Sequence, residues 1–145
     1  MLNPCSMLRS FYKNRFMSSI KKSPEEWRQI LTPEQFRILR ENGTEKPYTN
    51  AYWKVTEEGE YRCAGCASLL FTSQEKFISS CGWPAFTQPA TKEIVLRKDD
   101  SFGMERIEVK CGTCDGHLGH VFDDGPKPLG TRYCINSASL NFVKK

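Results

Sequence analysis

Hydrophobic and polar positions divide the chain into a short helical part and a longer part of extended segments. Residues 23–26 read Ser-Pro-Glu-Glu, which offers a Ser N-cap, Pro at the first helical position and Glu three residues after the cap. Residues 32–35, Thr-Pro-Glu-Gln, repeat this pattern, and Asn42-Gly43 is a typical helix end. The apolar residues that follow at helical spacing are Trp27, Ile30 and Leu31, then Phe36 and Leu39. The pattern predicts two short helices, the second with Phe36 and Leu39 facing inward.

From Tyr48 onward, short extended runs alternate with turn residues such as Glu58-Gly59, Asp99-Asp100-Ser101 and Asp124-Gly125-Pro126. The predicted strands are Tyr52–Val55, Leu69–Phe71, Ile94–Lys98, Met104–Val109, His120–Phe122, Thr131–Ile135 and Leu140–Val143. Short strands joined by tight turns favour antiparallel pairing. We therefore expect a mainly antiparallel β domain preceded by two helices.

The composition is that of one soluble globular domain, with 145 residues of which 39% are hydrophobic and 26% charged. No apolar run reaches the roughly 18 residues of a membrane-spanning helix, so no membrane segment is predicted. The chain has seven cysteines, and because this number is odd, at least one sulfur serves something other than an internal disulfide.

The excess of basic over acidic residues is confined to the N-terminal segment. The whole chain carries +4, but residues 1–22 hold five basic residues and no acidic one. Residues 23–145 are left with 16 basic and 17 acidic residues, a net charge of −1. The folded part therefore lacks the basic surface expected of a nucleic-acid-binding protein.

Residues 1–22 are also rich in serine and carry scattered apolar residues, a composition typical of a mitochondrial transit peptide. A secretory signal would need a continuous apolar run, which is missing here. Two alternatives stay open: the segment is a disordered tail, or a start at Met17 gives a shorter, cytoplasmic form. We expect a leader over residues 1–22, mitochondrial localisation, and a folded domain over residues 23–145.

Two C-x-x-C pairs, Cys63–Cys66 and Cys111–Cys114, predict a metal site. In a tight turn both thiolates of such a pair reach one ion, at a Zn–S distance of about 2.3 Å. Two pairs complete a tetrahedral site of four sulfurs, so the ion has no position left for a substrate. The 44 residues between the pairs exceed the roughly 15–20 of a compact zinc ribbon. We expect one structural zinc ion per chain, held between two separate β-hairpins.

Two other interpretations of these cysteine pairs are less favourable. Redox-active pairs of the thioredoxin type belong to a βαβ pattern, which surrounds neither pair. Two structural disulfides fit poorly with a protein of the mitochondrial matrix. Structural zinc is thus the preferred interpretation.

Cys134 is a candidate nucleophile because of its neighbours. On a strand, Arg132, Cys134 and Asn136 share one face, since alternate side chains lie on the same side. A nearby guanidinium favours the thiolate, which is the nucleophilic form. The alternative, an inert buried cysteine, stays open on these residues alone.

The two histidines of the chain, His117 and His120, are followed closely by Asp123 and Asp124. Two imidazoles and two carboxylates within eight residues can serve general acid–base catalysis near neutral pH. A second metal site and plain surface residues are the alternatives. Together with Cys134 and its polar neighbours, these residues favour a catalytic pocket.

Cys81 begins a segment that reads Cys-Gly-Trp-Pro. The glycine gives the sulfur a flexible neighbour, and Trp83 offers an aromatic wall against which a methyl or thioether group can pack. The alternative is a tight turn whose aromatic residues fill the core.

Three motifs and both C-x-x-C pairs resemble those of the methionine-R-sulfoxide reductases of B type. The motifs are Cys-Gly-Trp-Pro from Cys81, His-Leu-Gly-His-Val-Phe from His117, and Arg-Tyr-Cys-Ile-Asn-Ser-Ala-Ser-Leu from Arg132. The resemblance runs from about Glu25 to Phe142. It implies a zinc-bearing pair of antiparallel sheets, described as a β-tent.

The resemblance also implies roles for individual residues. Cys134 would attack the sulfoxide sulfur and become a sulfenic acid, and Cys81 would convert this to a disulfide that thioredoxin reduces. Trp83 would hold the substrate methyl group, with Phe122 in the same substrate site. His120 would protonate the sulfoxide oxygen, and the residues that match the surrounding polar pocket are His117, Asp124, Arg132 and Asn136. Ala85 stands where many members of the family have Ser, a difference that concerns hydrogen bonding in the loop.

This chemistry requires a thiolate and an acid together, because oxygen cannot leave a sulfoxide as oxide. A fixed methyl pocket opposite the acid would select one hand of the chiral sulfoxide. The implied partners are proteins that contain methionine sulfoxide, or free methionine-R-sulfoxide, and thioredoxin as reductant. We expect a monomer that binds neither nucleic acid nor membranes.

Two non-catalytic classes stay open as alternatives. One is a zinc-ribbon-like binding module, and the other is a guanine-nucleotide-exchange or chaperone factor built on a related tent. The presence of Cys134 within its motif favours the enzyme over both.

Overall fold

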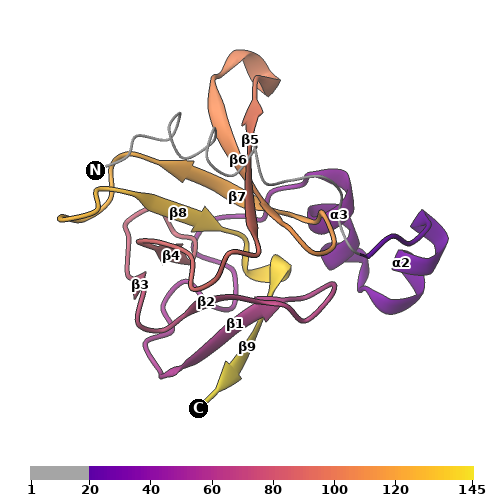
Figure 1. Ribbon diagram of the computed structural model, residues 1–145, viewed down its shortest axis with the longest axis horizontal. Coiled ribbons are helices and arrows are strands. Elements are labelled where there is room, and N and C mark those ends of the chain that lie inside the picture. The colour runs from indigo at the N-terminus through magenta and orange to yellow at the C-terminus, as the bar shows by residue number, and fades with distance from the viewer. Residues whose placement is uncertain (1–19) are drawn as a thin grey trace.

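The computed structural model describes residues 20–145, so Cys5 and most of the predicted leader lie outside the described part. Two antiparallel sheets form the body of the protein, and two helices lie beside them (Figure 1). The helices are α2 (Pro24–Ile30) and α3 (Pro33–Glu41), with short 3-10 turns η1 (Ser101–Gly103) and η2 (Ser137–Ser139). The strands are β1 (Gly59–Cys63), β2 (Leu69–Thr72), β3 (Lys76–Phe77), β4 (Ala85–Phe86), β5 (Ile94–Asp99), β6 (Arg106–Cys111), β7 (His117–Phe122), β8 (Arg132–Ile135) and β9 (Leu140–Lys144).

Both helices begin with the predicted capping boxes. The side chain of Ser23 accepts the N–H of Glu26 while the Glu26 carboxylate accepts the N–H of Ser23, and Thr32 and Gln35 repeat this exchange. Asn42 ends α3 in the left-handed region, with a φ of 57°. The side chains that the helices bury are Trp27, Phe36, Ile38 and Leu39. The two predicted helices are confirmed, and within residues 20–145 no helix is long and apolar enough to cross a membrane.

The two sheets pack face to face through aromatic side chains. The small sheet has the strand order β2-β1-β9, and the large sheet has the order β3-β4-β8-β7-β6-β5. Phe71 of the small sheet stacks on Phe86 of the large sheet, with ring centres 4.2 Å apart, and Tyr61 meets Phe86 edge-on at 5.1 Å. Tyr133 of β8 lies in the same core. The mainly β fold of two antiparallel sheets with two helices is confirmed.

Some strand predictions were wrong. Tyr52–Val55 is a turn, in which the N–H of Val55 donates to the carbonyl of Tyr52, and no sheet strand forms there. Three strands were missed: Gly59–Cys63, whose first residues look like a turn, and the two-residue strands Lys76–Phe77 and Ala85–Phe86. Two residues are too few to show any periodicity, and such strands exist because neighbouring strands hold them.

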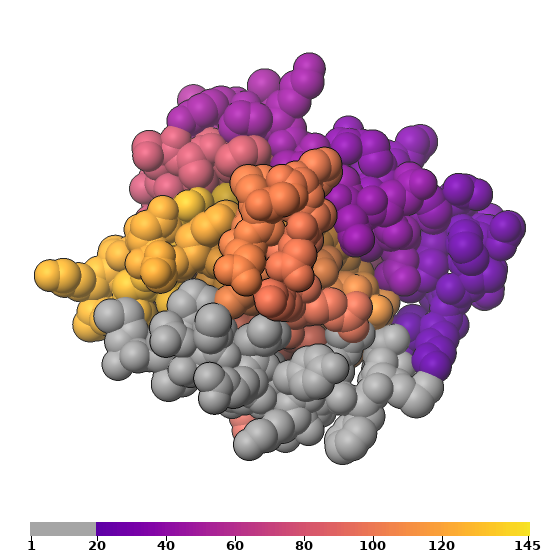
Figure 2. All heavy atoms as spheres, turned by 90° about the horizontal axis from the view of Figure 1, so that it is seen from above, coloured from indigo at the N-terminus to yellow at the C-terminus, as the bar shows by residue number. Residues whose placement is uncertain are grey.

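The hairpin of β5 and β6 stands out at the top of the large sheet in Figure 1 and faces the viewer in Figure 2. It pairs along six positions, from Ile94 opposite Cys111 to Asp99 opposite Arg106. One end of the hairpin therefore holds Cys111, the first cysteine of its C-x-x-C pair, and the other end holds the charged residues Asp99 and Arg106.

Candidate functional site

The four cysteines of the two C-x-x-C pairs converge on one cluster. Cys63 and Cys66 connect β1 to β2 in the small sheet, while Cys111 and Cys114 connect β6 to β7 in the large sheet. All four sulfurs lie within 4.8 Å of one another, with 3.6 Å from Cys63 Sγ to Cys114 Sγ and from Cys66 Sγ to Cys111 Sγ. Tetrahedral zinc separates its sulfur ligands by about 3.8 Å. The cluster therefore fits a zinc ion, and the predicted placement on two separate hairpins is confirmed.

The two helices cover this cluster. Trp27 of α2 packs beside Gly65, where a Cβ would lie 3.3 Å from the indole ring. The Arg40 guanidinium of α3 stacks on Trp27 at 4.6 Å from the ring centre and donates to the Cys114 carbonyl at 2.9 Å. Helices, sheets and cysteine cluster thus form one packed unit.

Alternation along β8 turns Cys134 and Arg132 away from the core. Tyr133 and Ile135 are buried between the sheets, while Arg132 and Cys134 are half-buried on the opposite face. His120 of β7 lies directly opposite Cys134 in the strand pairing. Opposed residues of antiparallel strands have Cβ atoms about 4.5–5.5 Å apart, so the imidazole and the thiol are neighbours on one face.

A cavity of about 160 Å³ opens on this face. Of the residues predicted for the site, those that line it are Cys81, Trp83, His120, Phe122, Arg132, Cys134 and Asn136. Thr44 and Arg106, which the sequence did not indicate, line it as well. Gly119 and Ile135 complete the wall. A Cβ at Gly119 would lie 2.0 Å from the Cys134 carbonyl oxygen, so only glycine allows β7 and β8 to approach this closely.

Cys81 and Cys134 form a thiol pair with 3.8 Å between their sulfurs. The hydrogen bond from Cys134 lowers the pKa of Cys81 to about 5. The same hydrogen bond and burial raise the pKa of Cys134, and the Arg132 guanidinium acts in the opposite direction. Arg132 therefore favours the Cys134 thiolate as expected from the sequence, but Cys81 outweighs it. At neutral pH the pair holds one proton on Cys134 and one negative charge on Cys81.

Each histidine is paired with a carboxylate. His120 Nε2 lies 2.8 Å from Asp99 Oδ2, and Arg106 lies 3.5 Å from the same oxygen. Burial lowers the pKa of His120, while the hydrogen bond to Asp99 acts in the opposite direction. His117 Nδ1 lies 2.6 Å from Glu108 Oε2, and both of these side chains are buried. His117 does not line the cavity and meets His120 edge-on, with ring centres 5.4 Å apart.

Asp124 fixes the guanidinium of Arg132. Arg132 Nε donates to Asp124 Oδ1 at 2.8 Å and Nη2 donates to Oδ2 at 3.1 Å, and the guanidinium lies 4.5 Å from the centre of the Phe122 ring. The ion pair lowers the pKa of Asp124. Asp124 itself is exposed and does not line the cavity, so it acts on the site through Arg132.

Trp83 and Asn136 are held by the main chain around them. Trp83 Nε1 donates to the carbonyl of Glu45 at 3.0 Å. Asn136 Nδ2 donates to the Leu118 carbonyl at 3.0 Å, and its Oδ1 accepts the N–H of Glu45 at 3.1 Å. Gly82 has a φ of 84°, which explains the glycine between Cys81 and Trp83.

Besides Thr44 and Arg106 of the cavity wall, sequence reasoning missed three residues that hold site residues in place: Asp99, Glu108 and Glu45. Asp99 was assigned to a turn, yet it reaches His120 from β5, two strands away from β7. The order of strands in a sheet is not contained in the spacing of residues along the chain. In the sequence, Glu108 and Lys110 alternate with Ile107 and Val109, which indicates a strand with one charged face. A charged face that is buried in a central strand calls for partners such as His117.

Comparison with known proteins gives one consistent result. The SelR domain family matches residues 31–144. A Leptospira interrogans protein is 54% identical over 127 residues, which are 87% of this chain and 97% of that protein. A Hahella chejuensis protein is 54% identical over 87% of this chain and 91% of its own length, and a Methanosarcina mazei protein is 50% identical over 88% and 92%. All three are named peptide methionine sulfoxide reductase MsrB. With its cysteine cluster, its thiol pair and this similarity over most of its length, the chain belongs to the SelR domain family of B-type methionine sulfoxide reductases.

Proposed function

We propose that this protein reduces methionine-R-sulfoxide, in proteins and as the free amino acid, through Cys134 and Cys81. The observation that carries the proposal is one small cavity that brings two thiols, 3.8 Å apart, together with His120 and Trp83. The relatives named peptide methionine sulfoxide reductase MsrB support the same class of reaction.

The first half of the reaction reduces the substrate. The proton of Cys134 passes to the neighbouring Cys81 thiolate, and Arg132 stabilises the Cys134 thiolate that remains. Cys134 attacks the sulfoxide sulfur and forms a transient S–S bond, while His120, in its protonated form, gives its proton to the oxygen. The S–S bond breaks again as the hydroxyl group passes to Cys134. The S–O bond of the substrate breaks and an S–O bond forms on Cys134, so methionine leaves and Cys134 becomes a sulfenic acid. Cys134 is oxidised by two electrons, and the substrate is reduced by two.

The second half of the reaction restores the thiols. Cys81, now protonated, attacks the sulfur of the Cys134 sulfenic acid, an S–S bond forms and water leaves. The sulfurs start 3.8 Å apart and a disulfide requires about 2.05 Å, so a small movement is enough. A dithiol protein of the thioredoxin type then reduces the disulfide and becomes oxidised itself.

Two carboxylates hold the charged groups in the geometry that this sequence of steps requires. Asp99 accepts a hydrogen bond from His120 and fixes its ring, while Asp124 fixes Arg132 beside the thiol pair. Trp83 and Phe122 supply an apolar wall for the methyl group in the same cavity as His120.

We further propose that the cluster of Cys63, Cys66, Cys111 and Cys114 holds one structural zinc ion. When bound, zinc ties the hairpin β1–β2 of the small sheet to the hairpin β6–β7 of the large sheet. All four ligand positions are then filled by sulfur. The active protein is proposed to be a monomer.

The test uses peptides that contain one hand of methionine sulfoxide, with wild-type protein and Cys81→Ser. Wild type should reduce the R form and leave the S form unchanged. Cys81→Ser should convert one R-sulfoxide per chain in a single turnover and continue with dithiothreitol, because this small dithiol reaches the Cys134 sulfenic acid directly. With thioredoxin its turnover should fall steeply, because thioredoxin reduces a disulfide.

Three outcomes would overturn parts of this proposal. Equal activity on the R and S sulfoxides would contradict the proposal that a methyl pocket selects the R form. Full activity of Cys134→Ser would contradict the role of Cys134 as the nucleophile. Full thioredoxin-dependent turnover of Cys81→Ser would show that another route returns Cys134 to the thiol.

A further inference from the structure

Glu45 contacts two walls of the active-site cavity without lining it. Its carbonyl oxygen accepts the indole N–H of Trp83 at 3.0 Å, and its own N–H donates to the side chain of Asn136 at 3.1 Å. Trp83 comes from the loop after Cys81, and Asn136 follows strand β8. One residue thus joins the substrate wall to the strand that carries Cys134.

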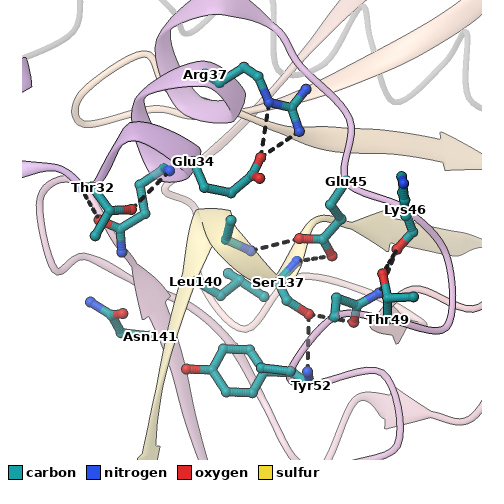
Figure 3. A pocket seen from close by; sticks show the side chains of 14 residues that line it. Thr32, Glu34, Arg37, Glu45, Lys46, Thr49, Tyr52, Ser137, Leu140 and Asn141 are labelled. Atoms are coloured by element: carbon teal, nitrogen blue, oxygen red, sulfur yellow. Dashed lines mark hydrogen bonds and ion pairs between the residues drawn. The ribbon is translucent and has the colours of Figure 1, made fainter.

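The side chain of Glu45 points away from that cavity. It lies in a polar pocket on the neighbouring surface, where its two oxygens accept the N–H groups of Ser137 at 2.5 Å and Ala138 at 2.9 Å (Figure 3). These are the first N–H groups of the 3-10 turn η2, directly after Asn136. The carboxylate therefore caps this turn and ties the backbone of Glu45 to it.

The side chain and the backbone of Glu45 thus act together. The carboxylate anchors the residue to η2, and the anchored backbone then presents one acceptor to Trp83 and one donor to Asn136. Burial raises the pKa of Glu45, and the hydrogen bonds from Ser137 and Ala138 lower it. A half-buried carboxylate is costly to keep charged unless such donors meet it, so the two N–H groups fix its geometry.

We propose that Glu45 is the positioning residue for the substrate wall, because it sets the orientation of Trp83 relative to Cys134. This inference rests on the proposed function insofar as Trp83 binds the substrate methyl group. Glu45 touches neither the thiols nor the cavity, so it should act through Trp83 and Asn136 and affect substrate binding more than the chemical step.

The first test measures the orientation of Trp83 without any assay of activity. In Glu45→Gln the amide keeps one acceptor oxygen, but its NH₂ group faces an N–H donor, so one of the two anchoring hydrogen bonds is lost. The indole N–H of Trp83, followed by NMR in the whole protein, should exchange with solvent about tenfold faster than in wild type, as expected for the weakening of one hydrogen bond. The indole N–H of the buried Trp27 should not change.

The matched control is Glu34→Gln. Glu34 lines the same polar pocket, but its carboxylate pairs with Arg37 on the exposed face of α3. This variant should leave the Trp83 exchange rate and the reduction of methionine-R-sulfoxide as in wild type. An unchanged Trp83 exchange rate in Glu45→Gln would overturn the proposal.

The second test is a double-mutant cycle with Trp83→Phe, which keeps an aromatic ring and removes the indole N–H. Glu45→Gln and Trp83→Phe should each raise the KM for an R-sulfoxide peptide by about tenfold, with a smaller change in kcat. Because both act on the same contact, the double variant should be close to the worse single variant. If the increases in KM of the two single variants multiply in the double variant, Glu45 acts on substrate binding independently of the Trp83 indole N–H.

Two further outcomes are distinguishable. If wild type reduces no sulfoxide, the proposed function fails, while the exchange of the Trp83 indole still decides whether Glu45 positions it. If Glu45→Gln does not fold, Glu45→Asp takes its place, since it keeps the charge and withdraws the carboxylate by one methylene. The same changes in exchange and KM are then expected, and their absence counts against the proposal.

Discussion

At the scale of single residues, the proton that Cys81 and Cys134 share determines which of the two sulfurs is a thiolate and therefore reactive. Cys81 has a pKa of about 5 because Cys134 donates a hydrogen bond to it. Its thiolate is therefore present above pH 5 and is lost as the pH falls through this value. Only thiolates react with alkylating reagents, so the two cysteines should be modified in a fixed order.

We predict that iodoacetamide modifies Cys81 before Cys134, with a midpoint near pH 5 in the dependence of rate on pH. Peptide mass spectrometry after brief exposure at each pH measures this. In Cys134→Ala the donor is gone, and the midpoint should move upward, toward the ordinary thiol value of 9.0. Equal midpoints in wild type and Cys134→Ala would show that the pair shares no proton.

Asp99 supplies a second prediction at this scale, because it orients His120. Asp99→Asn should slow sulfoxide reduction, and it should do so less than His120→Ala, which we expect to cost about 10²-fold or more as a general acid. Single-turnover rates of methionine formation measure both. The control is Asp100→Asn, an exposed neighbour beyond the end of β5, which should react like wild type. A full rate for Asp99→Asn would mean that strand pairing alone orients the imidazole.

At the scale of elements, the cysteine cluster joins hairpins that belong to different sheets. We predict one zinc ion per purified chain, measured by elemental analysis. Cys63→Ser or Cys111→Ser should lose the ion and unfold at a much lower temperature, because structural zinc contributes directly to folding. Cys81→Ser, outside the cluster, should keep its zinc. An active preparation without any metal would contradict this role.

How far the elements can be predicted depends on the range of the interactions that form them. The two helices follow from caps and spacing within a few residues, as at Ser23 and Thr32, and they were predicted correctly. The alternation of β8 likewise placed Arg132 and Cys134 on one face. Strands β3 and β4 depend on neighbours far along the chain, and the contact between Asp99 and His120 depends on strand order. Local pattern carries no information about either.

At the scale of the whole molecule, the prediction concerns residues 1–22, most of which lie outside the described part of the chain. Five basic residues without an acidic one predict import into mitochondria. A fluorescent reporter fused behind residues 1–22 should accumulate in mitochondria, as microscopy would show. The control is a fusion that starts at Met17 and lacks most of this charge, which should stay in the cytosol. A cytosolic location of both fusions would favour a tail without a targeting role.

The fold also places the thiol pair and most cysteines of the cluster in different environments. In the cluster, Cys63 and Cys111 are fully buried and Cys114 nearly so, under the cover of α2 and α3, while Cys66 is partly exposed. Cys81 and Cys134 are partly exposed as well, and both line the cavity. Oxidants attack accessible thiolates first. An oxidant is therefore expected to react with Cys81 and Cys134, which the proposed cycle restores, before it reacts with the three buried cysteines of the proposed zinc site. The helices over the cluster thus shield Cys63, Cys111 and Cys114 from oxidants that the thiol pair meets at the surface.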